Sequence, residues 1–227
     1  MKKSLFVLLI ILCGFETGFT QNTKFYGSGG SEMIFSFATI DNNGNTQGDV
    51  MRWSPVLNLQ AFANLDIANT IGFFTGLGCR NVGFIYNVPD TNITMKYRTY
   101  NLGIPIGLKI GKLDFMFIFA GYEIEFPFNY KEKKFENDHK DKYVAWFTNR
   151  VEPVQHTLMA GVQFPYGLDL KFKYYLTNFH NMNYVDGNGE KPYENLKSNI
   201  FYFSLSWDLF TNMKKYNKKD NLQTVMR

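Results

Sequence analysis

Alternation of apolar and polar residues with a period of two is the feature that most constrains how this 227-residue chain folds. It is clearest over residues 98–110, where the even-numbered positions from Tyr100 to Ile110 are all apolar. The odd-numbered positions between them are Asn, Gly, Pro, Gly and Lys. Successive side chains of a β-strand point to opposite faces, so the pattern predicts a strand with one apolar and one polar face. The segment is also longer than most strands of soluble proteins.

Seven other segments repeat this split, although a few aromatic residues such as Phe62 and Phe119 fall on faces that are otherwise polar. They cover residues 31–40, 52–63, 71–86, 116–126, 155–164, 168–177 and 198–210. Aromatic residues make up 18% of the chain, which agrees with a β-rich fold. With residues 98–110, these segments predict eight strands, an even number.

The connections between the predicted strands alternate between long and short. The long ones are residues 41–51, 87–97, 127–154 and 178–197, and the short ones are residues 64–70, 111–115 and 165–167. Consecutive antiparallel strands run in opposite directions, so all short connections share one rim and all long ones share the other. This asymmetry is typical of outer-membrane barrels. The predicted fold class is all-β, an eight-stranded antiparallel up-and-down transmembrane β-barrel.

A soluble lipocalin-like barrel also has eight two-faced strands, and periodicity alone does not separate the two classes. Three features favour the membrane barrel. The strands are long enough for a tilted crossing of the hydrocarbon layer. Glycines cluster on the polar face, where a narrow lumen needs room, and aromatic residues of the apolar face gather near strand ends as in interfacial girdles.

Composition excludes two other classes of protein. Apolar residues make up 45% of the chain, which excludes intrinsic disorder. The slightly negative mean hydropathy excludes a polytopic helical membrane protein, which needs repeated long apolar runs.

The N-terminus has the features of a secretory signal peptide: two lysines, an apolar run too short to span a bilayer, and then small or polar residues. We assign residues 1–20 to this cleaved signal, residues 21–210 to the barrel and residues 211–227 to a polar, basic periplasmic tail.

Cleavage leaves Cys79 as the only cysteine, so no intrachain disulfide is expected. The signal holds two lysines and one glutamate, so its removal lowers the net charge of +4 by one. A chain this close to neutral gives no case for nucleic-acid binding.

The signal, the eight amphipathic strands and the loop asymmetry together resemble the small OmpA/OmpX-type outer-membrane barrels. Segments that are similar to porin-family barrel proteins of Bacteroidota-type, Gram-negative bacteria are TGLGCRNVGFIY, YNLGIPIGLKIG, GVQFPYGLDLKFKYYLTNF and IFYFSLSWDLF. The resemblance implies a multi-pass protein of the outer membrane, surrounded by outer-membrane lipids. Its motifs describe strands and carry no catalytic signature.

Charged residues on the polar face are the candidate lumen residues. Five are acidic and five are basic: Glu32, Glu123, Glu125, Asp169, Asp208, Arg52, Arg80, Lys109, Lys171 and Lys173. An eight-stranded barrel is just wide enough for side chains to fill it, and an unpaired charge in such an interior is very costly. We therefore expect paired charges that close the lumen, which gives a structural role. A polar conduit with weak porin-like permeability is the alternative.

The long external loops are the other candidate sites, with an external ligand or partner expected at loops 127–154 and 178–197. The segment NYKEKKFENDHKDK mixes five lysines with four acids and reads as a solvated loop, with adhesin-like binding as the alternative. The next residues, Tyr143, Phe147 and Arg150, share helical spacing, which allows a short helix over the barrel mouth. Loop 178–197 is rich in Asn, Gly and Tyr, a composition that suits adaptable contacts.

Enzymatic and metal sites are not predicted. A membrane-embedded lipid-modifying enzyme needs a serine nucleophile beside a histidine base, and no serine lies in local register with His139, His156 or His180. Metal-ligand spacings such as H-x-x-x-H and C-x-x-C are absent from the sequence. We therefore expect a monomer without cofactor, metal or catalytic activity.

Overall fold

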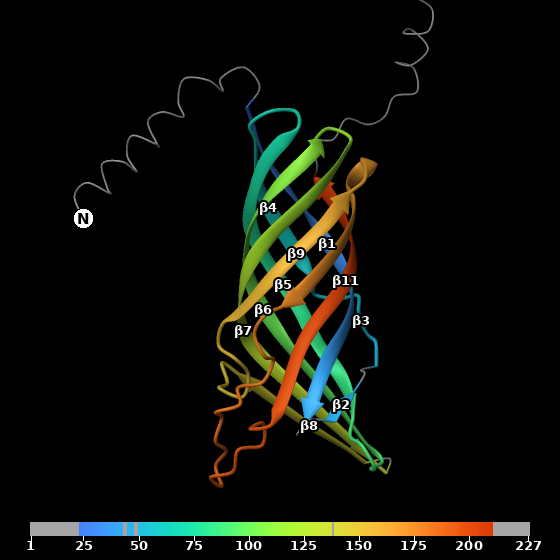
Figure 1. Cartoon of the computed structure of the whole chain (residues 1–227), viewed down its shortest axis with the longest axis vertical. Helices are drawn as coiled ribbons and strands as arrows, with labels where there is room; N and C mark the ends of the chain where they lie inside the picture. The colour runs from blue at the N-terminus through green and yellow to red at the C-terminus, as the bar shows by residue number, and fades with distance from the viewer. Residues whose placement is uncertain (1–22, 43–44, 48–49, 138, 211–227) are drawn as a thin grey trace, which may run out of the picture.

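The computed structural model describes residues 23–210 except 43–44, 48–49 and 138. Eight antiparallel strands form a closed ring, because the first and the last of them pair with each other (Figure 1). In ring order they are β1 (Lys24–Asn42), β4 (Leu59–Asp66), β5 (Ile71–Asn87), β6 (Ile93–Lys112), β7 (Met116–Glu136), β9 (Gln155–Gln163), β10 (Leu168–Tyr175) and β11 (Leu196–Phe210). This closed ring confirms the predicted eight-stranded antiparallel up-and-down barrel.

Three short strands lie outside the regular ring order. β2 (Asn45–Gln47) and β3 (Arg52–Ser54) pair with β1, and β8 (His139–Trp146) pairs with β7. Pro165–Gly167 forms a single 3₁₀ turn. Across the described residues, no helix is long and apolar enough to cross a membrane. The predicted signal, residues 1–20, and the predicted tail, residues 211–227, lie outside the described residues.

The two faces of the wall are sharply different. Along β6 the even-numbered side chains from Leu102 to Ile110 are 45–62% exposed, whereas the odd-numbered positions between them are buried. Each of the other seven strands of the ring also exposes large apolar side chains, for example Leu77, Ile118 and Leu205. A continuous apolar belt of this kind is stable only against lipid, so the ring is a transmembrane barrel with its polar face inward.

The three connections predicted to be short lie at one end of the barrel, at the top of Figure 1, and the connections predicted to be long lie at the other end. The short ones join β4 to β5, β6 to β7 and β9 to β10. The last of these turns needs a left-handed backbone at Gly167, where φ is 79°. The predicted asymmetry of the rims is therefore present.

Two segments predicted as loops are largely strand. Residues 87–97 are a tight β5–β6 hairpin that turns at residues 88–92. Within 127–154, β7 continues to Glu136 and the chain returns as β8, with Glu136 opposite His139. The predicted loop over 129–142 is wrong, since β7 and β8 cover most of it. The short helix that the spacing of Tyr143, Phe147 and Arg150 allows is not formed, since β8 continues to Trp146. Charges on both faces of this hairpin leave no apolar face, so the two-residue pattern is hidden in the sequence.

Candidate functional site

Nine of the ten charged residues predicted for the lumen are buried, and Arg52 is the exception. Six of the nine meet in one central cluster, and they come from four strands around the ring, β1, β5, β7 and β10. The central cluster consists of Glu32, Glu123, Glu125, Arg80, Lys171 and Lys173. Three carboxylates and three cations give it a formal charge of zero, which limits the cost of removing charges from water.

Arg80 is in the middle of the central cluster. Its Nε lies 3.2 Å from Glu32 Oε2, and its Nη1 contacts Glu123 Oε1. Two glycines leave room for the guanidinium, since a Cβ on Gly78 would lie 2.2 Å from Arg80 Nη1 and one on Gly103 would lie 1.9 Å from Glu123 Oε1. Glycines on the inward face thus permit the largest charged side chain of the barrel to lie across it.

Two lysines of β10 complete the central cluster. Lys173 Nζ lies 2.6 Å from Glu123 Oε2 and also contacts Glu125 Oε1. Lys171 Nζ lies 3.0 Å from Glu32 Oε1. Because the lysines are two residues apart, both project from the same face of β10. Every carboxylate of the cluster therefore has a cation beside it.

Neutral polar side chains inside the lumen donate hydrogen bonds to Glu125. Its Oε2 accepts hydrogen bonds from Asn101 Nδ2 at 2.7 Å and from Tyr175 OH at 2.8 Å. Asn101 Nδ2 also donates to Gln155 Oε1 at 2.9 Å. All four side chains are buried, so these bonds replace the water that the carboxylate loses on folding.

A separate ion pair lies nearer the rim of short turns. Lys109 Nζ is 2.7 Å from Asp66 Oδ1 and donates hydrogen bonds to Tyr26 OH and Asn64 Oδ1, both at 3.0 Å. Asp66 is not among the predicted lumen residues, because the sequence predicts a connection over residues 64–70. In the structure, β4 continues to Asp66. Extending the alternation from Gln60 through Asn64 would have found it.

The remaining two predicted acids, Asp169 and Asp208, lie in the same half of the lumen. Ser206 Oγ donates to Asp169 Oδ2 at 3.2 Å. Both aspartates line a cavity of about 30 Å³, and Lys109 and Lys171 lie on the same cavity. This volume holds no more than a few water molecules.

Arg52 differs from the other nine predicted lumen residues. Its Nη1 donates to Asn81 O at 3.1 Å and its Nη2 donates to Asn81 Oδ1 at 2.6 Å. The hollow beside it, about 80 Å³, is lined by cations of β6 and β7. The expectation that Arg52 pairs with a lumen carboxylate is therefore wrong. The sequence suggests a continuous strand over 52–63, but the chain leaves the strand between Ser54 and Leu59 and displaces this end.

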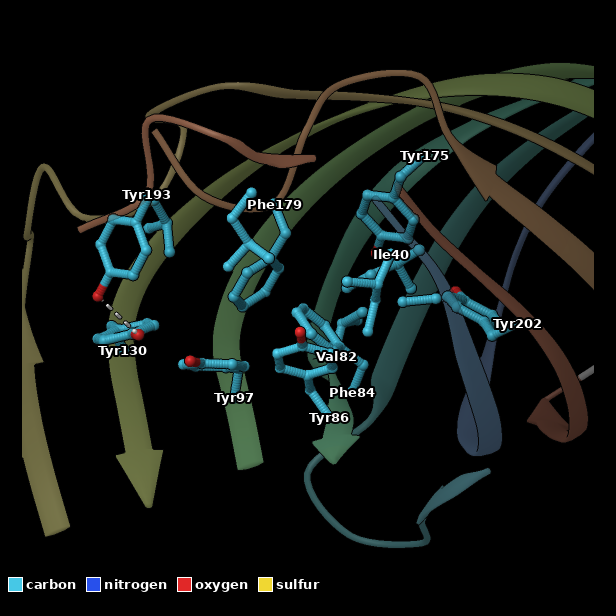
Figure 2. Packing of buried hydrophobic residues seen from close by; sticks show 14 of the residues in the cluster. Ile40, Val82, Phe84, Tyr86, Tyr97, Tyr130, Tyr175, Phe179, Tyr193 and Tyr202 are labelled. Carbon is cyan, nitrogen blue, oxygen red and sulfur yellow. Dashed lines mark hydrogen bonds between the residues drawn. The ribbon is translucent and has the colours of Figure 1, made fainter. Parts of the chain in front are cut away.

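An aromatic layer closes the lumen on the side of the long connections (Figure 2). Phe84 of β5 packs at 5.3 Å, centroid to centroid, against Phe179, which follows β10. Tyr97 and Tyr130 extend the layer across β6 and β7, and Tyr130 OH lies 3.5 Å from Tyr193 OH. Residues of the loop between β10 and β11 therefore fold into the mouth and fill it.

His180 is at the centre of this layer and is fully buried. Its ring stacks on Tyr193 at 4.3 Å and meets the ring of Tyr97 edge-on at 4.6 Å. Burial, with a smaller contribution from the positive charge of Arg150, lowers the pKa of His180 from 6.5 to about 3. The imidazole is therefore neutral at physiological pH and acts as one more ring of the plug.

The loop between β10 and β11 is expected to loosen in acid. When the loop opens, the His180 pKa returns toward 6.5, so the open state binds more protons below that pH. The stabilisation of the closed loop is complete above pH 6.5 and is lost progressively as the pH falls toward 3. Hydrogen-exchange protection of residues 176–195 should decrease over this range in the wild type. An equal decrease in His180→Phe, which has no group to titrate there, would contradict this explanation.

The other two histidines lie on different surfaces. His156 Nδ1 contacts Tyr122 OH on the outward face of the wall, and His139 on exposed β8 lies 3.2 Å from Asp141. Within the described residues, no group of three or more His, Cys, Asp or Glu side chains is placed to hold a metal ion.

Comparisons with known proteins concern the fold alone. The chain matches no protein-family model and no curated protein. One similar structure is Ail, the attachment invasion locus protein of Yersinia pestis, solved in complex with the heparin analogue sucrose octasulfate. It is 10% identical, with a TM-score of 0.39, over 81% of this chain and 99% of Ail. Another is Neisserial surface protein A, 11% identical, with a TM-score of 0.38, over 82% of this chain and 99% of that protein.

Proposed function

We propose that this protein is a sealed outer-membrane barrel with a structural role and that it does not conduct solutes through its lumen. The observation that carries the proposal is the neutral central cluster, in which Arg80 reaches carboxylates of β1 and β7 across the interior. An open path past this cluster requires separating charges that lie about 3 Å apart and away from water, which is costly. The aromatic layer closes the same lumen a second time on the side of the long connections.

The outer membrane is the compartment we propose, because closed barrels with one short-turn rim and one long-loop rim are characteristic of it. Short turns then face the periplasm, and the β7–β8 hairpin and the loop between β10 and β11 face outward. We also propose that the barrel acts as a monomer, because β1 and β11 close the ring within one chain. We propose that it has no enzymatic activity, because the charged side chains of the central cluster are paired with one another.

Solute flux tests the sealed lumen. Liposomes carrying the refolded wild type should retain a small entrapped sugar as long as protein-free liposomes do. Arg80→Ala/Glu123→Ala removes one cation and one anion, so the cluster stays neutral. Combined with replacement of residues 177–195 by a short Gly-Ser linker, which removes the loop part of the aromatic layer, this variant is expected to release the sugar. Release by the wild type at the rate of the combined variant would contradict the proposal.

Binding at the outer end is a second candidate function. It is favoured by the β7–β8 hairpin, a rigid sheet beyond the membrane belt in which almost every β8 side chain is exposed. Proteoliposomes with wild type can be compared on an array of glycans and matrix proteins with a variant whose residues 131–145 are replaced by a short Gly-Ser turn. A signal lost only in that variant supports this function, and identical signals contradict it.

A further inference from the structure

Strand alternation sorts the mixed charges of the external hairpin onto two faces. Residues directly opposite each other in neighbouring strands share a face, and Lys96 of β6 is opposite Lys133 of β7, which is opposite Lys142 of β8. The neighbouring rows place Arg98 beside Lys131 and Phe135 beside Lys140. We define the outward basic face by six cations: Lys96, Arg98, Lys131, Lys133, Lys140 and Lys142.

The acids of the hairpin project from the opposite face. Glu132 is opposite Tyr97, which is buried, so this second face is turned toward the barrel mouth. Glu136 and Asp141 alternate onto the same side, where they pair with Lys134 at 2.6 Å and with His139 at 3.2 Å. At the described positions of β6, β7 and β8 that form the outward basic face, there is no carboxylate.

Three lysines in a row across three strands repel one another, and like charges directly opposite each other are destabilising. Two cations of the outward basic face lie over aromatic rings: Lys96 Nζ is 5.0 Å from the centroid of Phe135, and Lys131 Nζ is 5.0 Å from that of Tyr100. Burial and, after it, the charges of neighbouring cations, Lys140 first, lower the pKa of Lys133. An external anion is the group that removes this repulsion.

Arg52 turns part of the outward basic face into a defined hollow. Arg52 is fixed by its two hydrogen bonds to Asn81, at 3.1 Å and 2.6 Å. With Lys96, Arg98, Lys131 and Lys133 it lines the hollow of about 80 Å³. Five cations around a space of a few water volumes suit a compact oxyanion such as a phosphate group.

The height of the outward basic face above the membrane indicates where such a phosphate comes from. Tyr100, Phe128 and Trp146 form a row of neighbouring aromatic rings directly above the apolar belt, with centroids 6.3 Å and 6.1 Å apart. Such rows lie at the interface between hydrocarbon and headgroups. Arg98 is two residues beyond Tyr100 and Lys96 is four, so they lie roughly 7 and 13 Å further along the strand. These cations therefore reach the headgroup layer, and they point away from the barrel.

We propose that the outward basic face, together with Arg52, binds the phosphate groups of phosphorylated glycolipids in the outer leaflet. Lysine and arginine clusters next to a membrane crossing recognise lipid phosphates in this way. The site goes beyond the sealed-barrel function, and it rests on the proposed outer-membrane location with the β7–β8 hairpin facing outward. It also explains why the cations collect on the face turned toward lipid.

Lipid retention tests this proposal. The full chain is reconstituted in vesicles of phosphatidylcholine and diphosphorylated lipid A, and the lipids that remain bound after extraction are counted by native mass spectrometry. The wild type is expected to retain lipid A in preference to phosphatidylcholine, and Lys96→Gln/Lys133→Gln/Lys142→Gln is expected to lower that preference at least tenfold. The matched control, Lys112→Gln/Lys134→Gln/Lys191→Gln, removes the same charge elsewhere and should retain the preference.

Two further arms use the unmodified protein, so the test does not depend on a variant folding. Lipid A without its phosphates should show no preference, and high salt should weaken retention of the phosphorylated form. Equal retention of both forms, or of wild type and the outward-face variant, would overturn the proposal. Binding of a soluble sulfated polysaccharide without lipid A enrichment would also overturn it, because the ligand would then be a soluble polyanion. None of these results depends on whether the lumen conducts.

Discussion

Glu123→Ala is expected to destabilise the folded barrel by about 3–5 kcal/mol, because removing one partner of a buried ion pair leaves an uncompensated charge. Glu123 is fully buried and contacts both Arg80 and Lys173. Without it, three cations face two carboxylates, and all five of these side chains are buried. Urea unfolding in lipid vesicles, followed by the heat-modifiable mobility of the barrel on a gel, measures the change.

A matched control for Glu123→Ala is Glu136→Ala. Glu136 pairs with Lys134 at 2.6 Å, but its side chain is 45% exposed, so its loss should cost less than about 1 kcal/mol. Glu123→Ala/Lys173→Met restores a neutral cluster and should recover part of the lost stability. If Glu123→Ala costs no more than Glu136→Ala, the central cluster does not hold the barrel together.

Ile104→Arg is expected to cost about 2–4 kcal/mol in lipid, the penalty for a cation near the bilayer midplane on the outer wall of a barrel. Ile104 lies in the middle of β6 and is 47% exposed on the face that we assign to lipid. The same unfolding measurement reports the loss.

Val185→Arg controls for the chemistry of Ile104→Arg. Val185 is 49% exposed in the loop between β10 and β11, beyond the membrane belt, so arginine there remains in water. It should change stability by only a few tenths of a kcal/mol. Equal effects at the two positions would mean that the exposed apolar belt does not face lipid.

Strand number, topology and the inward direction of the polar face follow from the sequence because each membrane-crossing strand has one apolar face. Residues 98–110 illustrate this, since every even position from Tyr100 onward is apolar and β6 exposes them as expected. The side chains that fill the lumen are charged, and alternation places them without showing which of them meet. Nothing in the sequence indicates that Arg80 would reach Glu32 and Glu123 from different strands.

Two parts of the structure could not be predicted, for physical reasons. Outside the membrane neither face of a strand needs to be apolar. The sequence of the β7–β8 hairpin therefore has no apolar–polar alternation, and it predicts a loop. The aromatic layer depends on a loop folding back, which brings Phe179 and His180 onto Phe84 and Tyr97. Long-range packing of this kind has no local pattern in the sequence.

Single-channel conductance tests the sealed lumen most directly. The chain without residues 1–20 is refolded, shown to be folded by its heat-modifiable mobility, and inserted into a planar bilayer. The wild type should give no discrete current steps, whereas Arg80→Ala/Glu123→Ala with residues 177–195 replaced by a short Gly-Ser linker should give them under the same conditions. Discrete steps from the wild type would mean that ions pass the central cluster, and the proposal of a closed barrel would be wrong.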